Sequence, residues 1–336
     1  MSRLVICLVF VLAAFTGCSS CVIDPQTISI WGGDIQVPEL LSVYPVSTYE
    51  LTAEFSGLVT VNAACVEQTD DSTKVIETLW NQKAASSLIT FVMAEKIGIG
   101  VPVILSASVQ DSGGNSYSFS VPFTGYNERV PDLRITEIRT GYAKLKVEYM
   151  EILVLSDGNM AGVAVYNAMN STKSVYEFPG CEVRAGDFVL WHLRSVEEGL
   201  ICESDAMDAS LGTDSSNSAW DFWDTQERAP LKSTNVLLLQ ERIGGRILDA
   251  LLCAESKYDA WPSEAVRLAA EAAVEAGAWG PTALITDAVC SDYMTPTRTL
   301  GRNPQFDDTD CAGNWMVCAT SCASPGTVNS SKPHVP

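Results

Sequence analysis

The sequence predicts an all-β protein made of two consecutive β-sandwiches, the second of which carries a short helical insertion. Apolar and polar residues alternate at period two in many segments, as in a strand with one buried face. Turn-forming strings separate these segments at short intervals. A polar stretch that ends in proline, residues 126–131, divides the 336 residues into two parts, each long enough for its own core.

The first part spans residues 31–127. Its alternation is clearest in four segments, residues 49–55, 59–65, 103–109 and 117–123. The string Asp-Ser-Gly-Gly-Asn at residues 111–115 predicts that the last two segments form a β-hairpin over residues 101–123. Short strands joined by such turns are typical of a β-sandwich. In this pattern, and in its D-x-x-G-N turn, the segment resembles a bacterial immunoglobulin-like domain.

The second part, residues 132–330, carries a series of motifs in a fixed order, and residues 331–336 after it are expected to form a tail. It opens with L-R-I-T-E-I (133–138), E-Y-M-E-I (148–152), G-V-A-V (162–165), Y-E-F-P (176–179), A-G-D-F-V-L (185–190), S-T-N-V-L-L-L (233–239) and G-R-I-L-D-A (245–250). It closes with R-T-L-G-R (298–302), D-T-D (308–310), N-W (314–315) and S-P-G-T-V-N (324–329). In this order the segment resembles the lamin-tail domain, an immunoglobulin-like sandwich of nuclear lamins and exported bacterial proteins.

The match to the lamin-tail pattern has two departures. Residues 153–156 stand where the family usually has an asparagine, and Val163 stands where it usually has tryptophan. The closing motifs are the most specific part of the match. The resemblance implies an immunoglobulin-like sandwich and a binding or tethering role, since bacterial members commonly accompany other exported modules.

Two insertions interrupt this pattern. Residues 203–228 are acidic and serine-rich, and residues 263–277 are alanine-rich. In the second insertion, Ser263 can cap a first helical turn and Gly277 can end the helix. We expect this helix to pack on the sandwich. A partner-binding helix is the alternative, although a small alanine face buries little area.

The N-terminus reads as an export signal. Arg3 precedes an apolar run, residues 4–15, that is shorter than the roughly 20 residues needed to span a bilayer. The following Phe-Thr-Gly-Cys resembles a lipobox, in which Cys18 receives a lipid. The sequence therefore predicts a lipoprotein signal peptide (1–17), a tether (18–30) and a membrane-anchored protein. An ordinary cleaved secretory peptide is the alternative. Ser19 follows Cys18 where an aspartate is absent, which resembles the pattern of lipoproteins sorted to the outer membrane rather than the inner membrane.

Acidity limits the partners. Only Arg3 is charged before Cys18, so the mature chain would keep 20 of 21 basic residues and all 41 acidic ones, a formal charge of −21. Nucleic acid is excluded as a partner, because phosphates are bound by neutralising Lys and Arg. Anionic lipid surfaces are equally unfavourable, which leaves the lipid as the membrane link. The expected partner is an envelope protein or a glycan.

Eleven cysteines include Cys7 in the signal and Cys18, leaving nine. Export permits disulfides, yet an odd number leaves at least one thiol free or paired with another chain. Cys311, Cys318 and Cys322 cluster without zinc-ligand spacing, so buried thiols or local disulfides are expected there.

No catalytic motif is evident. The two histidines are His192, in a strand-like segment, and His334 near the end, so a nucleophile and base would have to be built on His192. We expect His192 to be a structural strand residue and the protein to have no catalytic activity. The alternative is an exported hydrolase that uses carboxylates of the insertion at residues 203–228.

Calcium is the one cofactor that the sequence raises. Asp307, Asp308 and Asp310 offer the oxygen ligands that calcium prefers, as do the aspartates of residues 205–214. Neither group has EF-hand spacing, and aspartates that bond to their own turns explain them equally well. No other cofactor is expected.

The best candidate for a contact surface is the aromatic and acidic run Trp220, Asp221, Phe222, Trp223 and Asp224. Exposed aromatic rings are frequent anchors of interfaces. The alternative is that these rings attach the insertion to the core. Together these observations predict a cell-envelope lipoprotein that acts as a binding, adhesion or structural module.

Overall fold

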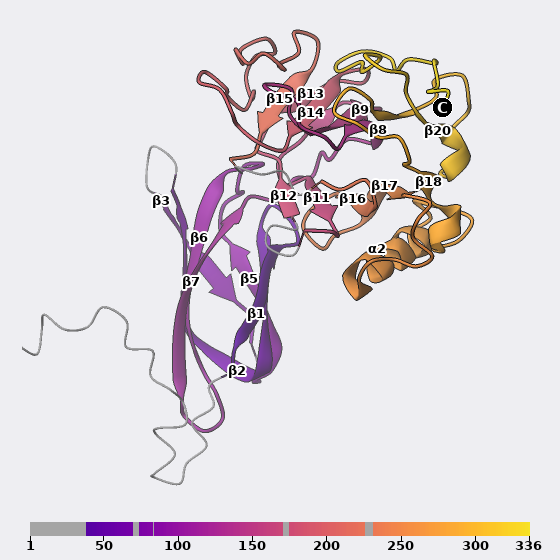
Figure 1. Cartoon of the computed structure of the whole chain (residues 1–336). Helices are drawn as coiled ribbons and strands as arrows, with labels where there is room; N and C mark the ends of the chain where they lie inside the picture. The colour runs from indigo at the N-terminus through magenta and orange to yellow at the C-terminus, as the bar shows by residue number, and fades with distance from the viewer. Residues whose placement is uncertain (1–37, 70–73, 83, 171–174, 226–230) are drawn as a thin grey trace, which may run out of the picture. The chain divides into compact units, whose positions relative to one another are not determined.

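The structure is a computed structural model that describes residues 38–69, 74–82, 84–170, 175–225 and 231–336 (Figure 1). Cys18 and the whole predicted signal and tether lie outside these residues. Nearly all regular structure in the described residues is β-strand, with one α-helix, so the all-β class is confirmed. None of the helices in these segments has the length and apolar character needed to cross a membrane.

The chain divides into two compact units. The described residues of the first lie within 38–95 and 103–123, and the second contains Lys96–Pro102 and Thr124–Pro336. Residues 96–102, which the sequence analysis placed in the first domain, belong to the second unit because they bond to its first residues. The amide of Gly100 donates to the carbonyl of Gly125, and the amide of Gly125 donates to Val101.

One long strand organises the first unit. The strands are β1 (Leu40–Pro45), β2 (Glu50–Gln68), β3 (Lys74–Ile76), β4 (Thr78–Trp80), β5 (Ser86–Met93), β6 (Pro102–Gln110) and β7 (Ser116–Thr124). They form a sheet in the order β4-β5-β2-β6-β7, with β1 and β3 also paired to β2. The first half of β2 pairs with β1 and β5, and its second half pairs with β3 and β6. This long strand therefore belongs to two sets of neighbours.

The predicted hairpin is confirmed as β6 and β7. Its turn is closed by Asp111, whose Oδ1 accepts a hydrogen bond of 2.8 Å from the amide of Asn115. Gly114 has a φ of +85°, which favours glycine at this position.

The alternating apolar residues of β2 point inward as expected, with Leu51, Ala53 and Phe55 buried. Tyr49 precedes β2 and is 47% exposed.

Two sheets make up the second unit. The first has the order β15-β14-β9-β8-β19-β20. Its strands are β8 (Leu133–Arg139), β9 (Tyr149–Val154), β14 (Phe188–His192), β15 (Trp220–Trp223), β19 (Leu300–Arg302) and β20 (Trp315–Val317). The second has the order β12-β11-β16-β17-β18. Its strands are β11 (Ala164–Asn167), β12 (Val175–Glu177), β16 (Asn235–Gln240), β17 (Ile247–Ala254) and β18 (Val289–Cys290). A separate pair joins β10 (Gly158–Asn159) to β13 (Glu182–Val183).

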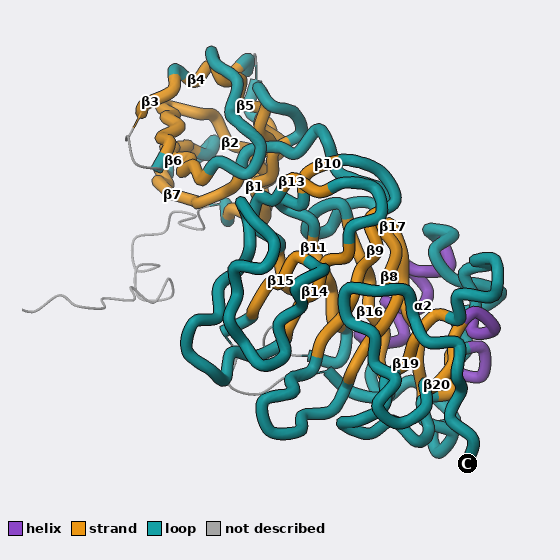
Figure 2. Tube along the Cα trace, turned by 90° about the horizontal axis from the view of Figure 1, so that it is seen from above, coloured by secondary structure: helices purple, strands orange, loops and turns teal. Residues whose placement is uncertain are grey.

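A common core lies between these two sheets. Ile135, Ile152 and Val189 of the first sheet belong to the same buried cluster as Leu237 and Leu251 of the second. We call the face toward this core the inner face of the six-stranded sheet, and the opposite face its outer face. Long loops surround the strands of this unit (Figure 2). Some of these loops cover residues of the outer face.

The predicted helical insertion is confirmed as α2 (Glu264–Glu275). The Oγ of Ser263 accepts a hydrogen bond from the amide of Val266, and Gly277 has a φ of +73° after the helix end. The buried face consists of Val266 and three alanines, and it packs against β16 and β17 (Figure 1). This face is covered by the protein's own sheet, in agreement with the packing role.

Two further expectations concern the C-terminal region. Residues 331–336, expected to be a tail, bond back to the unit, since the amide of His334 donates to the carbonyl of Val317 at 2.8 Å. The described cysteines are all free thiols, including Cys311, Cys318 and Cys322. Burial raises the pKa of Cys318 to about 11, so its thiol stays protonated at neutral pH.

Candidate functional site

Cross-strand rows describe the outer face of the six-stranded sheet. The registers of neighbouring strands align Arg139, Tyr149, His192 and Trp223 in one row, and Glu137, Glu151, Leu190 and Asp221 in a second. All eight side chains are buried. A third row, Arg134, Leu153 and Phe188, is only partly buried. The chemistry-bearing residues of this unit therefore gather under a cover, and one row stays open.

The predicted contact surface, residues 220–224, forms strand β15 and its end. Asp221 and Phe222 are fully buried and Trp223 is 6% exposed, whereas Trp220 and Asp224 are partly buried. The expectation of an exposed aromatic patch is therefore wrong for Phe222 and Trp223. The reason is the parallel pairing of β15 with β14, which places Phe222 in the inner core and Trp223 beside His192. The packing alternative describes these rings.

The free edge of β15 is covered by the start of the acidic insertion. The amide of Glu203 donates to the carbonyl of Asp221 at 2.9 Å, and the amide of Asp221 donates to Oε2 of Glu203 at 2.8 Å. The amide of Trp223 lies 3.3 Å from Sγ of Cys202. Because these groups occupy backbone positions that a neighbouring strand would use, the edge is closed to further pairing.

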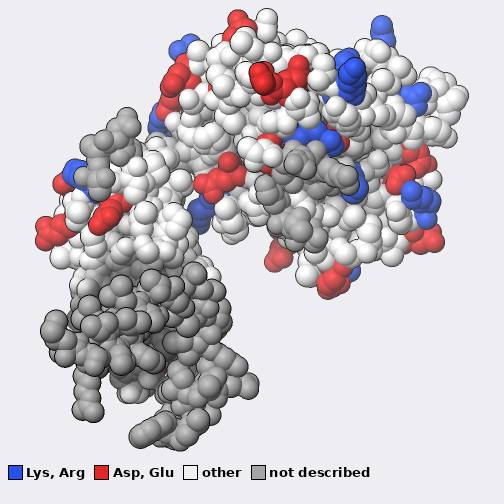
Figure 3. All heavy atoms as spheres, turned by 60° about the vertical axis from the view of Figure 1, so that its left-hand side comes forward, with Lys and Arg blue, Asp and Glu red and all other residues white. Residues whose placement is uncertain are grey.

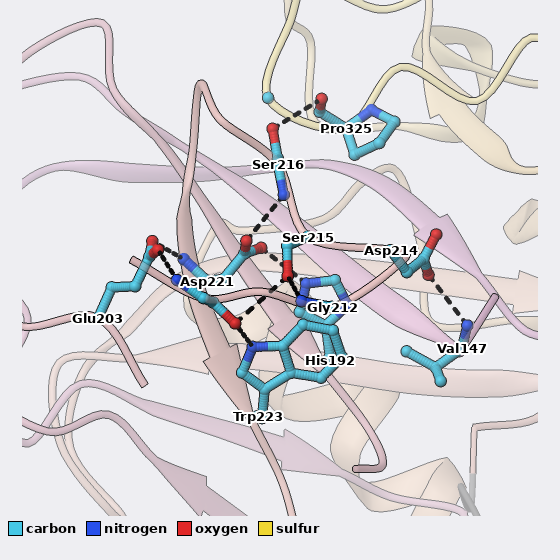
Figure 4. Close-up of polar contacts among 12 residues, drawn as sticks. Val147, His192, Glu203, Gly212, Asp214, Ser215, Ser216, Asp221, Trp223 and Pro325 are labelled. Atoms are coloured by element: carbon cyan, nitrogen blue, oxygen red, sulfur yellow. Dashed lines mark hydrogen bonds and ion pairs between the residues drawn. The ribbon is translucent and has the colours of Figure 1, made fainter. Parts of the chain in front are cut away.

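His192 is paired and fully buried. Its Nε2 lies 2.7 Å from Oδ1 of Asp221, whose Oδ2 accepts a hydrogen bond of 2.8 Å from the amide of Ser216 (Figure 4). The imidazole stacks on Trp223 with ring centroids 3.8 Å apart and planes 9° apart. Its Nδ1 has no partner among the described residues. This arrangement fixes the imidazole in a fully buried position, away from any surface that a substrate could contact.

The insertion is attached to the sheet by its acidic and hydroxyl side chains. Oε1 of Glu203 accepts hydrogen bonds from the amides of Ala209 and Ser210, at 2.7 and 2.9 Å. Nε1 of Trp223 donates to Oγ of Ser210 at 2.9 Å, and Oδ2 of Asp214 accepts from the amide of Val147 at 2.9 Å (Figure 4). The buried carboxylates of this insertion thus accept hydrogen bonds from backbone amides.

Glu137 and Glu151 form a second buried acidic group, which the sequence reasoning did not identify as a site. They are cross-strand partners, and neither side chain is exposed. Oε1 of Glu137 accepts from Oγ1 of Thr299 at 2.6 Å, and the hydroxyl of Tyr149 donates to its Oε2. Burial, followed by the neighbouring Glu137 charge, raises the pKa of Glu151 to about 8. Glu151 therefore carries a proton at neutral pH.

The segment Ser324–Asn329, which we call the C-terminal strap, covers this pair. The amide of Ser324 donates to Oε2 of Glu137 at 3.1 Å, and the amide of Gly326 donates to Oε2 of Glu151 at 2.7 Å. Nδ2 of Asn329 donates to the carbonyls of Thr136 and Arg302, at 2.7 and 3.0 Å. The E-x-x-E and S-P-G-x-x-N motifs were the sequence signals of this contact.

Four charged residues form a second ionic group, the charge quartet: Arg134, Arg302, Asp249 and Asp308. Nη2 of Arg302 lies 2.9 Å from Oδ1 of Asp249, and its Nη1 pairs with Oδ1 of Asp308. Nε of Arg134 lies 2.7 Å from Oδ2 of Asp308. Burial raises the pKa of Asp249 to about 6, although Arg302 opposes this shift. The side chain of Arg134 is 36% exposed, compared with 16% or less for the other three.

This quartet bears on the predicted calcium residues. Both carboxylate oxygens of Asp308 face guanidinium groups, and the carbonyl of Asp307 accepts from Nδ2 of Asn314 at 2.6 Å. The Asp308 carboxylate is therefore engaged by arginine. Among the residues the structure describes, no group of three or more His, Cys, Asp or Glu side chains has metal-binding geometry, and this includes Asp307 to Asp310 and Asp205 to Asp214.

Two hollows lie on either side of the Arg134–Asp308 pair. The first, of about 180 Å³, is lined by the open row of the outer face together with residues of two loops, among them Pro304, Phe306 and Val328. The second, of about 390 Å³, is lined by four aspartates, two arginines and three leucines: Asp132, Asp249, Asp308, Asp310, Arg134, Arg246, Leu133, Leu155 and Leu248. Figure 3 shows that acidic and basic side chains are interspersed on the face that it draws.

Comparison with known proteins assigns most of the second unit to a protein family. Residues 131–317 match the family model TP_1001_2nd, described as "protein second domain". The chain belongs to this family. A protein of Treponema pallidum (strain Nichols), described as an uncharacterized protein, is 30% identical over 193 residues, which are 55% of this chain and 49% of that protein. The chain thus matches about half of this relative's length.

A solved structure, that of a DUF4876 family protein from Bacteroides thetaiotaomicron VPI-5482, aligns with 79% of this chain and 90% of its own. The TM-score is 0.26 and the identity is 13%. The TP_1001_2nd region begins two residues before β8 and ends at Val317, the last residue of β20. It includes the buried rows and the charge quartet, and the C-terminal strap lies beyond it.

Proposed function

We propose that this protein is an exported, lipid-anchored component of the bacterial cell envelope that binds or tethers a partner and has no catalytic activity. In this proposal both units are immunoglobulin-like sandwiches, and the second is related to the lamin-tail domain. The N-terminal signal pattern and the lipobox-like Cys18 support an envelope location, and the relative from Treponema pallidum supports a bacterial one. The lamin-tail-like motifs support a binding or tethering role.

One structural observation carries the non-catalytic part of the proposal. Four groups on the outer face of the six-stranded sheet that could perform acid–base chemistry, His192, Glu137, Glu151 and Asp221, are fully buried. Each contacts neighbouring side chains or backbone amides that fix the insertion or the C-terminal strap. An enzyme needs such groups to face a substrate. Here they support a rigid outer surface, which suits a scaffold that presents a contact site.

Metabolic labelling with a fatty acid tests the anchor. Cells that produce the wild-type chain should incorporate label into the protein, whereas cells that produce Cys18→Ala should not. Cys21→Ala provides the matched control, because it removes the other cysteine of the same segment. Equal labelling of wild type and Cys18→Ala would contradict the anchor and leave secretion without a lipid.

Capture from envelope fractions tests the binding role. Full-length protein immobilised through a C-terminal tag should retain a specific partner from solubilised envelopes. Protein that has been heat-unfolded serves as the control for nonspecific retention. Failure to retain any component in both the membrane and the soluble envelope fractions would contradict a binding role.

A further inference from the structure

The open row of the outer face is a built groove. Arg134, Leu153 and Phe188 lie side by side because β8, β9 and β14 pair in that register. The neighbouring rows of the same face are buried under the insertion and the strap. The groove is therefore the part of this face that the protein's own loops leave accessible.

Apolar side chains rim this groove. Phe306 is 60% exposed and Val328 is 71% exposed, and both line the first hollow. Large apolar side chains with this much exposure are unfavourable in water, and their burial against a ligand would be favourable. Together with Leu153 and Phe188 they line one hollow, which gives one apolar side chain of a ligand a place to insert.

The most exposed charge that lines the groove belongs to Arg134, whose Nε pairs with Asp308. The quartet of Arg134, Arg302, Asp249 and Asp308 contains two charges of each sign, but only Arg134 has substantial exposure. Its guanidinium carries five N–H donors, and the fork of donors that remains beyond Nε matches the two oxygens of a carboxylate. A ligand at the groove mouth therefore meets a guanidinium, which complements a negative group.

The size of the hollow limits the ligand. Its volume is about 180 Å³, and a cavity of about 150 Å³ accommodates a benzene ring. One aromatic or branched side chain fills it, whereas a whole lipid or a glycan chain does not fit. The C-terminal residue of a peptide combines one apolar side chain with an adjacent carboxylate, which matches the hollow and Arg134.

We propose that the Arg134 groove binds the C-terminus of a peptide whose last residue is apolar. The α-carboxylate pairs with Arg134, and the last side chain inserts between Phe306 and Val328 above Leu153 and Phe188. This inference rests on the proposed binding function and names its partner as a protein with an apolar, free C-terminus.

Fluorescence anisotropy with full-length protein tests the groove. The probe is fluorescein-labelled Gly-Ser-Gly-Ser-Gly-Phe with a free carboxylate, compared with the same peptide as a C-terminal amide and with a version that ends in Asp. Because a hydrogen bond to a charged group contributes about 1.5–3 kcal/mol, the amide should bind at least about tenfold more weakly. The peptide that ends in Asp should also bind more weakly, because the floor is apolar.

Variants assign the effect to residues. Arg134→Gln should remove the difference between acid and amide, and Arg134→Lys should keep part of it. Phe306→Ser should weaken acid and amide alike. Arg246→Gln, which alters an exposed arginine of the neighbouring hollow, and Leu284→Ser, which alters another exposed apolar residue, should leave binding unchanged.

Several results would overturn the proposal. Equal affinity of the acid and the amide for the wild type would exclude carboxylate recognition, even if Arg134→Gln does not fold. Absence of binding at millimolar peptide would exclude a peptide site. Competition by 3-phenylpropionate at the strength of the peptide would assign the hollow to free aryl acids instead. A protein that fails these tests but still retains an envelope partner would keep the proposed function and lose only the groove.

Discussion

Glu137 and Glu151 lie opposite each other on β8 and β9, and a bulge at Thr136 turns the side chain of Glu137 to the outer face of the sheet, where Glu151 lies. Period-two alternation would place Glu137 on the same face as Ile135, which is in the inner core. The extra residue instead returns Ile138 to the core and directs Glu137 toward the C-terminal strap. Two carboxyl groups thus share one buried site.

This carboxyl pair predicts a pH dependence of stability. The pKa of Glu151 is raised from 4.5 to about 8, so the folded state keeps a proton that the unfolded chain loses at lower pH. The stabilisation is complete below about pH 4.5 and is lost as the pH rises through about 8. We expect Glu151→Gln, which stays neutral, to lessen this loss by on the order of 1 kcal/mol per pH unit.

Thermal unfolding between pH 5 and pH 9 measures the effect. The midpoint of wild type should fall more steeply over this range than that of Glu151→Gln. Glu198→Gln, which changes an exposed glutamate, should follow the wild-type curve. Parallel curves for wild type and Glu151→Gln would contradict the buried proton.

The pair of His192 and Asp221 predicts a contrast between two variants. Asp221→Ala leaves a buried imidazole without its partner and should lower the free energy of unfolding by about 3 kcal/mol. Asp221→Asn can still accept from the amide of Ser216 and place its amide nitrogen against Nε2 of His192, so its cost should be clearly smaller. Urea unfolding followed by tryptophan fluorescence measures both. Asp205→Ala, at an exposed position of the same insertion, is the control; equal losses for Ala and Asn at residue 221 would contradict the pairing.

The two tryptophans of β15 should differ in their contributions to stability. Trp223 is 6% exposed, stacks on His192 and donates to Ser210, so Trp223→Ala should cost about 3–5 kcal/mol. Trp220 is only partly buried and donates to Oδ2 of Asp187 at 3.1 Å, so Trp220→Ala should cost less. Calorimetry of the two single variants measures this order. If Trp223→Ala melted like wild type, the ring would not anchor the insertion.

The C-terminal strap predicts a difference between two glycines. Gly326 and Gly244 both have positive φ, at +76° and +67°. An added Cβ would meet Oγ of Ser216 at 2.3 Å in the first case and nothing within 4 Å in the second. Gly244→Ala should therefore cost about 1–2 kcal/mol from backbone strain alone, and Gly326→Ala should cost more. Chemical denaturation compares them, and equal costs would mean that the strap does not pack on the insertion.

Local signals were sufficient for much of the fold. The β6–β7 hairpin follows from its alternation and its Asp-Ser-Gly-Gly-Asn turn, and α2 follows from Ser263 and Gly277 at its ends. These features depend on residues close in sequence. The all-β class could be predicted for the same reason.

The site depends on pairings that local patterns do not encode. Trp223 was expected at a surface because its sequence neighbours are acidic, yet parallel pairing with β14 buries it beside His192. Glu137 and Glu151 were visible only as parts of motifs, because the bulge at Thr136 determines which face Glu137 takes. The sequence did not indicate Arg134 as a site residue, because its exposure relative to Arg302 depends on pairing with Asp308, which lies far along the chain.

The C-terminal strap has a consequence for biosynthesis. Gly326 follows Glu151 by 175 residues, so β8 and β9 are synthesised long before the segment that covers their acidic side chains. Contacts between residues this far apart in sequence form late and slow folding. The outer face of the six-stranded sheet therefore stays incomplete until the C-terminal strap has been synthesised, and a product interrupted after Val317 would expose the carboxyl groups of Glu137 and Glu151.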